Sequence, residues 1–224
     1  MANPYPPAPW TVRAEMHGAM VKMPPGSIPA DVLPAGIDVL RRDGSAVLSA
    51  VWWDYRQGGT LVYREFLVAT LSRDPRVGTI LQIWVDSEQS MVAGRELWYI
   101  PKELAELSFD HGAGFSAAMR IGDREVVSYR FTPRWTVPGR WPAKVVTVQE
   151  QDGTVRRTTG SYRCRFQTGR GELVIPADSE VAYLRRGRPV RHIAMLAVTG
   201  RFGTRSVDRP SAVVPHGGRN EESR

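Results

Sequence analysis

Hydrophobic and polar residues alternate over short runs along most of the chain, a pattern that favours β-strands. Residues 60–70 (TLVYREFLVAT) show part of this alternation. With the strand period of two, one face of this segment carries every second side chain, here Leu61, Tyr63, Glu65, Leu67 and Ala69. The pattern therefore predicts a strand on which Tyr63 and Glu65 point the same way.

Further segments rich in β-branched and aromatic residues also predict strands. They are residues 46–55, 79–85, 114–121, 125–131, 144–150, 154–166, 172–175 and 190–202. Gly122-Asp123 and Asp152-Gly153 are turn signals between consecutive strands. Many strands with short turns predict a β-rich α+β domain that forms a barrel or a sandwich, since closure or stacking protects strand edges.

One segment has a helical pattern. Asp86 is its predicted N-cap, with Gln89 three residues later as in a capping box. The helix should end before Pro101, which biases Ile100 away from helical angles. A second short helix is predicted for residues 101–106, because proline is favourable in a first helical turn.

The length of 224 residues fits one large domain. Residues 1–17 are expected to form an extended arm, since four prolines fall within the first twelve residues. Residues 18–207 form the expected domain, and residues 208–224, polar and punctuated by proline and glycine, a flexible tail.

The composition, with 42% hydrophobic and 24% charged residues, excludes a disordered chain, a collagen and a coiled coil. The net charge of +7 raises the question of nucleic-acid binding. Its arginines are scattered, however, and no zinc-finger spacing, aromatic RNP-like box or basic heptad repeat is present. We interpret the charge as a solvated surface and expect no nucleic-acid partner.

The sequence contains no clear motif for a metal site, a secretory signal or a membrane span. The lone Cys164 excludes an internal disulfide and a CxxC metal site, and the four histidines lack metal-ligand spacing. The start MANPYPPAPW does not read as a secretory signal, and no apolar run reaches the ~18–20 residues that span a bilayer. We therefore expect a cytoplasmic protein without a membrane partner.

Lysine is scarce, with 27 arginines but only three lysines: Lys22, Lys102 and Lys144. Lys102 lies in the segment VAGRELWYIPKEL, residues 92–104. This segment resembles the signature of the acetoacetate decarboxylase family, in which a helix with G-R-E-L precedes an aromatic stretch and Pro-Lys-Lys-Leu. Tyr63-Arg64-Glu65 fits the family's upstream Tyr-x-Glu. The resemblance covers most of residues 18–205.

The resemblance implies a closed, cone-shaped β-barrel with a flanking sheet and a few short helices. It also implies a homo-oligomer and a small-molecule keto substrate. Lys102 stands where the family's lysine forms a Schiff base, and Glu65 would be the pocket carboxylate. Tyr63 and Trp98 would line the pocket. No cofactor or metal is implied, because the protonated imine is itself the electron sink.

The chemistry of an imine requires a neutral amine, whereas a free lysine has a pKa near ~10.4. Burial or a neighbouring cation lowers this pKa, the latter being the known case of acetoacetate decarboxylase itself. Here Glu103 replaces the family's second lysine, and it would raise the pKa of Lys102 if the two side chains met.

The family's carboxylate-binding arginine is also missing. Lys22 stands near its place and would offer a point charge without the planar guanidinium fork. We therefore include Lys22 and Glu103 among the expected substrate-binding residues. These departures make acetoacetate a less suitable substrate, and they favour another keto acid or related ketone.

Several alternatives remain open at this point. Glu65 either moves protons in a pocket or forms a salt bridge with one of the many arginines. Trp52 and Trp53 place one ring on each strand face, so one belongs to the core and the other to a pocket or an oligomer contact. Three functions are open: a lyase of the decarboxylase type, a family member that catalyses aldol condensation, dehydration or cyclisation, and a ligand-binding barrel without catalytic activity.

Overall fold

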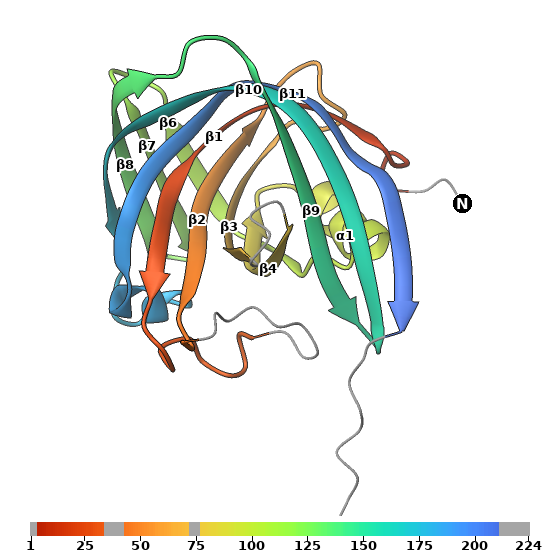
Figure 1. The fold of residues 1–224 in the computed structure, drawn as a ribbon, viewed down its shortest axis with the longest axis horizontal. Coiled ribbons are helices and arrows are strands. Elements are labelled where there is room, and N and C mark those ends of the chain that lie inside the picture. The colour runs from red at the N-terminus through yellow and green to blue at the C-terminus, as the bar shows by residue number, and fades with distance from the viewer. Residues whose placement is uncertain (1–3, 34–42, 72–76, 211–224) are drawn as a thin grey trace, which may run out of the picture.

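A computed structural model of the protein describes residues 4–33, 43–71 and 77–210. Within these residues, seven strands close into a barrel: β1 (Trp10–Met23), β2 (Ala46–Tyr55), β3 (Tyr63–Leu71), β4 (Val77–Val85), β9 (Trp141–Gln151), β10 (Thr154–Val174) and β11 (Arg188–Pro210). The barrel is closed because β11 pairs with both β1 and β10 (Figure 1). The expected closed β-barrel is confirmed.

The pairing is antiparallel around the barrel except between β4 and β9, which run parallel through Val77 with Val146 and Gly78 with Thr147. Helix α1 (Glu88–Trp98) lies beside this seam (Figure 1). After α1, the short strand β5 (Lys102–Leu104) returns parallel to β4. The chain therefore brings the lysine-bearing segment back against the barrel immediately after the helix.

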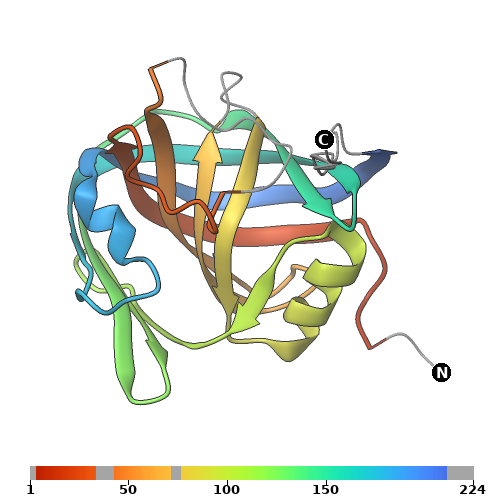
Figure 2. The same ribbon diagram turned by 90° about the horizontal axis from the view of Figure 1, so that it is seen from below.

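A flanking sheet extends the barrel through β8 (Arg124–Thr136), which pairs with β10, and continues to β7 (Phe115–Ile121) and β6 (Glu106–Asp110). The short 3-10 helix η1 (Ala182–Arg186) lies between β10 and β11 in the sequence. Figure 2 shows the flanking strands and η1 on the side of the barrel away from α1. No helix in the described residues has the length and apolar character needed to cross a lipid bilayer.

Two hydrophobic clusters form the core, and β3 lies between them. Phe66 and Val68 of β3 pack into a cluster shared with the flanking sheet, which includes the fully buried Trp52. Tyr63 and Leu67, on the other face of β3, pack into a cluster around α1. Both faces of β3 are therefore buried, which explains why its alternation is only partial.

Several predicted elements need correction. Residues 10–17 belong to β1 rather than to an arm, because pairing with β11 begins at Trp10 and pairing with β2 begins at Ala14. Residues 101–106 form no helix. Instead, Lys102 to Leu104 pair with β4, and this ladder outweighs the weak helix-start signal of Pro101. The two predicted strands at 154–166 and 172–175 are one strand, β10.

The chain ends and the helix cap also differ from the prediction. Residues 208–210 belong to β11, and residues 211–224 lie outside the described residues. Ser87, not Asp86, caps α1, since its side chain accepts from the Ser90 N–H at 3.2 Å. Asp86 instead accepts from the Arg64 N–H at 2.7 Å. The helix itself lies where the sequence predicts it.

Candidate active site

Lys102 is buried, with only 3% of its surface exposed, and its ammonium group has three polar contacts. Its Nζ donates to Glu65 Oε2 at 2.8 Å, to Ser90 Oγ at 2.9 Å and to the Tyr63 hydroxyl at 3.2 Å. Nζ also lies 4.8 Å from the centre of the Tyr63 ring. A lysine at 3% exposure needs such partners, since an unpaired buried charge is strongly destabilising.

Helix α1 also contacts the lysine, through Ser90, Gly94 and Arg95. Gly94 leaves room for the lysine stem, because a Cβ at this position would lie 2.6 Å from Lys102 Cδ. The neighbouring Arg95 donates from Nε to the Lys102 carbonyl oxygen at 2.7 Å. The G-R-E-L segment thus has a physical role: its glycine admits the lysine side chain and its arginine fixes the lysine backbone.

Glu65 comes from β3 and is as buried as its partner, with 3% exposure. The Tyr55 hydroxyl lies 3.4 Å from Oε1 and the Tyr63 hydroxyl 3.5 Å from Oε2, so both tyrosines donate to the carboxylate. Strand register explains the grouping, because Tyr55 of β2 lies directly opposite Tyr63 of β3. The ion-pair partner of Glu65 is Lys102 rather than an arginine.

The electrostatics favour a charged pair at rest. Burial alone would lower the pKa of Lys102, but the carboxylate of Glu65 and the hydrogen bonds outweigh it, so the pKa is raised above its ordinary value. Burial raises the pKa of Tyr55 and, with less effect, that of Tyr63. At neutral pH the site therefore holds an ammonium, a carboxylate and neutral phenols.

A cavity of about 110 Å³ lies against this pair. Aromatic side chains make up much of its wall, namely Trp10, Trp53, Tyr55, Tyr63, Trp98, Tyr162 and Phe202. The rings of Tyr55 and Tyr63 stack at 4.3 Å, and Trp10 meets Trp98 edge to face at 4.8 Å. The arrangement places one amine and one carboxylate at the wall of a small, predominantly apolar chamber.

The family described as acetoacetate decarboxylase (ADC) matches residues 1–185. The chain belongs to the acetoacetate decarboxylase family. The family predicted from residues 92–104 is therefore confirmed, and with it membership in a family of enzymes. No curated protein matches the sequence.

Solved structures of acetoacetate decarboxylase relatives share the fold at low identity. The enduracididine biosynthesis enzyme MppR complexed with pyruvate is 17% identical, with 93% of each chain covered and a TM-score of 0.63. The acetoacetate decarboxylase of Legionella pneumophila is 14% identical, with 95% of this chain and 92% of that chain covered and a TM-score of 0.66. An acetoacetate decarboxylase-like enzyme from Sphingomonas wittichii RW1 is 15% identical, with a TM-score of 0.63 and coverage of 91% and 93%.

Of the residues predicted for the acetoacetate decarboxylase site, Lys102, Glu65, Tyr63 and Trp98 all line the cavity, whereas Lys22 and Glu103 do not. Glu103 is exposed, because successive side chains of β5 point to opposite faces. Lys22 is also exposed, near the end of β1 opposite to the part that lines the cavity. The structure therefore places neither residue at the cavity, and a role for them in substrate binding stays a prediction that this geometry does not support.

Three further residues of the site were missed by sequence reasoning: Ser90, Tyr55 and Tyr162. Ser90 lies four residues before Gly94, so helical spacing already put both on one face of α1. Tyr55 and Tyr162 lie far from the motif in sequence and reach the cavity through strand register alone. Trp53 lines the cavity while Trp52 is in the core, as the opposite strand faces require.

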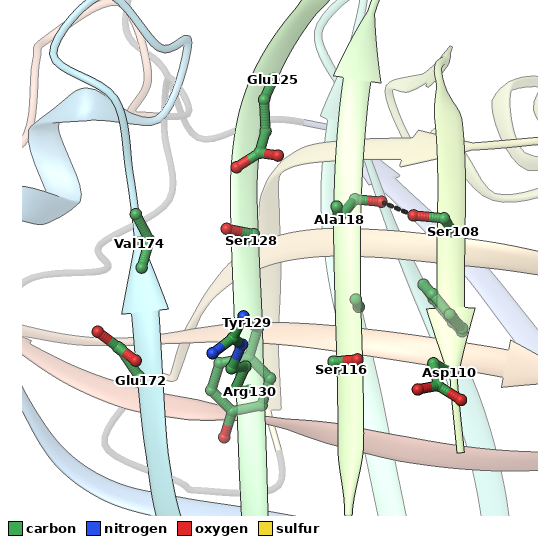
Figure 3. Close-up of a pocket in the computed structure, with 12 residues that line it drawn as sticks. Ser108, Asp110, Ser116, Ala118, Glu125, Ser128, Tyr129, Arg130, Glu172 and Val174 are labelled. Carbon is green, nitrogen blue, oxygen red and sulfur yellow. Dashed lines mark hydrogen bonds between the residues drawn. The ribbon is translucent and has the colours of Figure 1, made fainter. Parts of the chain in front are cut away.

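A larger hollow, of about 510 Å³, lies on the outer face of the flanking sheet (Figure 3). Small side chains such as Ser116, Ala118 and Ser128 line its floor, and the longer Arg130 and Glu172 flank them. Neither Lys102 nor its hydrogen-bond partners line this hollow. Among the described residues, no three His, Cys, Asp or Glu side chains are grouped as metal ligands would be. We therefore place the candidate active site at the interior cavity.

Proposed function

We propose that the chain forms a Schiff base between Lys102 Nζ and the carbonyl carbon of a small keto acid or related ketone. The protonated imine then accepts the electrons released when a carbon–carbon bond breaks or an α-proton leaves. The observation that supports this most is the buried Lys102 amine at the wall of an apolar cavity, 2.8 Å from a carboxylate. A lysine with only a structural role has no need of a cavity beside its amine.

Glu65 is positioned to accept and donate the protons of this reaction. It first takes a proton from the Lys102 ammonium, which leaves a neutral amine and a carboxylic acid. The amine attacks the carbonyl carbon, a C–N bond forms as the C=O π bond breaks, and a proton moves from the nitrogen to the carbonyl oxygen, which becomes a hydroxyl group. Glu65 then returns its proton to that hydroxyl, which leaves as water. The product is a cationic iminium beside a carboxylate, so the charge of the pair is unchanged.

The reaction class is a carbon–carbon lyase or its reverse, an aldol-type condensation. No cation adjoins Lys102 among the described lining residues, and the carboxylate of Glu65 raises the pKa of the lysine instead of lowering it. This differs from what the family's decarboxylases require and favours a reaction other than acetoacetate decarboxylation. One structure of MppR holds the condensation product of pyruvate and imidazole 4-carboxaldehyde, which is consistent with bond formation on this fold. Homo-oligomeric assembly and a cytoplasmic location stay predictions.

Reductive trapping tests the proposal. The protein is incubated with cyanoborohydride and a panel of pyruvate, β-keto acids and simple ketones, and the adduct is located by peptide mass spectrometry. We expect a mass increase on Lys102, none in Lys102→Arg, and an unchanged adduct in the matched control Lys144→Arg, whose side chain is exposed on β9.

Two results would overturn the proposal. One is a folded wild-type protein that gives no adduct with any compound at pH values up to about 9, which would favour a silent ligand-binding barrel. The other is full turnover in Lys102→Arg with a substrate that the wild-type protein converts, because a guanidinium does not form the imine at these pH values.

A further inference from the structure

The interior cavity has an unusual charge balance for a site that binds keto acids. Among its lining residues, Lys102 and Glu65 are the two side chains charged at neutral pH, and they pair with each other at 2.8 Å. When an imine forms, its nitrogen stays cationic and keeps Glu65 as its partner. A substrate carboxylate would therefore add a negative charge that no described lining residue neutralises.

The hydroxyl groups of the wall do not supply a replacement. Tyr55 and Tyr63 donate to Glu65, and Thr147 donates to the Thr158 carbonyl oxygen. A buried carboxylate requires two or more donors, and these three hydroxyls are already engaged. The remaining polar groups of the wall include the hydroxyls of Thr11 and Tyr162 and the indole N–H of Trp98, and these groups are uncharged, so they would not neutralise a carboxylate.

The size and shape of the cavity limit the other substituents. About 110 Å³ is somewhat smaller than an engineered apolar cavity of about 150 Å³ that holds benzene. The stacked rings of Tyr55 and Tyr63 form one wall, and the edge-to-face pair Trp98 and Phe202, with centroids 4.9 Å apart, forms another. Such walls favour a compact apolar or aromatic group.

We infer that the compound which condenses with Lys102 carries no carboxylate and is an uncharged aldehyde or ketone with a compact apolar or aromatic substituent. This inference rests on the Schiff-base function proposed above. Without a carboxylate there is no CO₂ to lose, so the iminium reacts at its α-carbon. Glu65 takes the α-proton, the C–H electron pair forms the enamine double bond, and the nitrogen becomes neutral. The enamine double bond then supplies the electron pair for a C–C bond to the carbonyl carbon of a second compound, whose oxygen takes the proton from Glu65. The nitrogen is again a cationic iminium, and water hydrolyses it to release the product and Lys102.

The test compares two methyl ketones of nearly the same shape, 4-oxopentanoate and 5-methyl-2-hexanone, in which a carboxylate replaces an isopropyl group. Cyanoborohydride delivers hydride to the iminium carbon after the carbonyl oxygen has left as water, and the secondary amine on Lys102 is quantified by mass spectrometry. Each yield is divided by that of N-acetyllysine under the same conditions. We expect the neutral ketone to label Lys102 at least about tenfold more than the anion.

A variant with an added cation provides the complementary arm. Leu61 lies in the cavity wall and is only partly buried, so Leu61→Arg introduces a guanidinium, with Leu61→Gln as the uncharged control. We expect Leu61→Arg to raise labelling by 4-oxopentanoate severalfold over Leu61→Gln, because the two variants share the loss of the leucine and differ in the added charge. Equal or stronger labelling of the wild-type protein by 4-oxopentanoate would overturn this inference alone. Absence of labelling by both ketones would overturn the Schiff-base function together with it.

Discussion

At the scale of single residues, the pair of Lys102 and Glu65 combines two opposing effects on one amine. Burial disfavours the ammonium, while the carboxylate 2.8 Å away stabilises it, and the carboxylate prevails. Under the proposed mechanism, the resting protein therefore holds the Lys102 nucleophile in protonated form, with its proton acceptor in contact. Reactivity would then depend on the transfer of that proton to Glu65 rather than on a permanently neutral lysine.

Glu65→Gln should separate these two effects. Without the carboxylate, burial dominates, so the pKa of Lys102 falls and the amine becomes neutral at lower pH than in the wild-type protein. The pH profile of Lys102 acetylation by acetic anhydride, read by mass spectrometry, should shift to lower pH. Turnover should nevertheless decrease by about 10²-fold or more, because the group that moves protons is lost.

The matched control for this prediction is Glu103→Gln. Glu103 is exposed on the opposite face of β5, so its loss should leave the acetylation profile of Lys102 in place. A profile that stays unchanged in Glu65→Gln, or that moves to higher pH, would contradict the assigned electrostatics.

The residues of the site differ in how far the sequence could reveal them. Lys102, Glu65 and Tyr63 were predictable because they belong to local motifs. The orientation of Glu103 was not, since it depends on whether residue 102 begins a helix or a strand. Lys22 was placed by counting along the chain, and that count could not account for the path of β1 across the barrel.

At the scale of elements, the composition of the sequence predicted most of the strands, but it did not predict which strands pair with each other. Strand β2 was predicted at its observed bounds, residues 46–55. Strand β1 was not predicted, because its first residues follow a proline-rich stretch. Strand β6 was not predicted either, because its five residues are too few to show a clear alternation of hydrophobic and polar positions. Pro101 weakly favours the start of a helix, but hydrogen bonding between β4 and β5 makes this segment a strand. This pairing is a long-range effect that a single sequence does not display.

Helix α1 depends on an arginine from a distant strand. Arg156 of β10 donates from Nη1 to the carbonyl oxygens of Glu96 at 3.1 Å and Leu97 at 2.9 Å, near the C-terminal end of the helix. Its guanidinium also lies 3.7 Å from the centre of the Tyr99 ring. These contacts satisfy carbonyl groups that the helix leaves unpaired.

Arg156→Leu should therefore destabilise the protein by about 1–3 kcal/mol, because the last carbonyl groups of the helix lose a charged donor while the aliphatic stem is retained. Urea unfolding gives the free energy, and hydrogen exchange should become faster in the amides of α1. The neighbouring Arg157 is exposed, so Arg157→Leu should change stability by no more than about 0.5 kcal/mol. Equal losses in the two variants would show that Arg156 does not support the helix.

At the scale of the whole molecule, the barrel and the flanking sheet are joined through a shared core that contains a buried histidine. His17 of β1 has 5% exposure and stacks on Phe115 of β7, with ring centroids 4.0 Å apart. Its Nδ1 has no hydrogen-bond partner among the described residues. Burial lowers the pKa of His17 to about 3, and the nearby His111 and Arg56 add to this effect. The neutral ring is thus part of what holds the two halves together.

Acid should consequently weaken the whole fold. The pKa of His17 is lower in the folded state than its ordinary value of 6.5, so the unfolded chain binds the proton more tightly. The contribution of the neutral ring is complete above pH 6.5 and is lost as the pH falls towards about 3. At a pH of about 4.5 the loss amounts to about 2–3 kcal/mol.

His17→Phe keeps a ring against Phe115 but cannot take up a proton. We expect the difference in unfolding free energy between pH 7 and pH 4.5, measured in urea, to be about 2–3 kcal/mol smaller in this variant than in the wild-type protein. Carboxylates titrate in both proteins and cancel in the comparison. If both proteins lose the same free energy over this pH range, the shared core does not owe its acid sensitivity to His17, and the charge of the flanking groups must dominate instead.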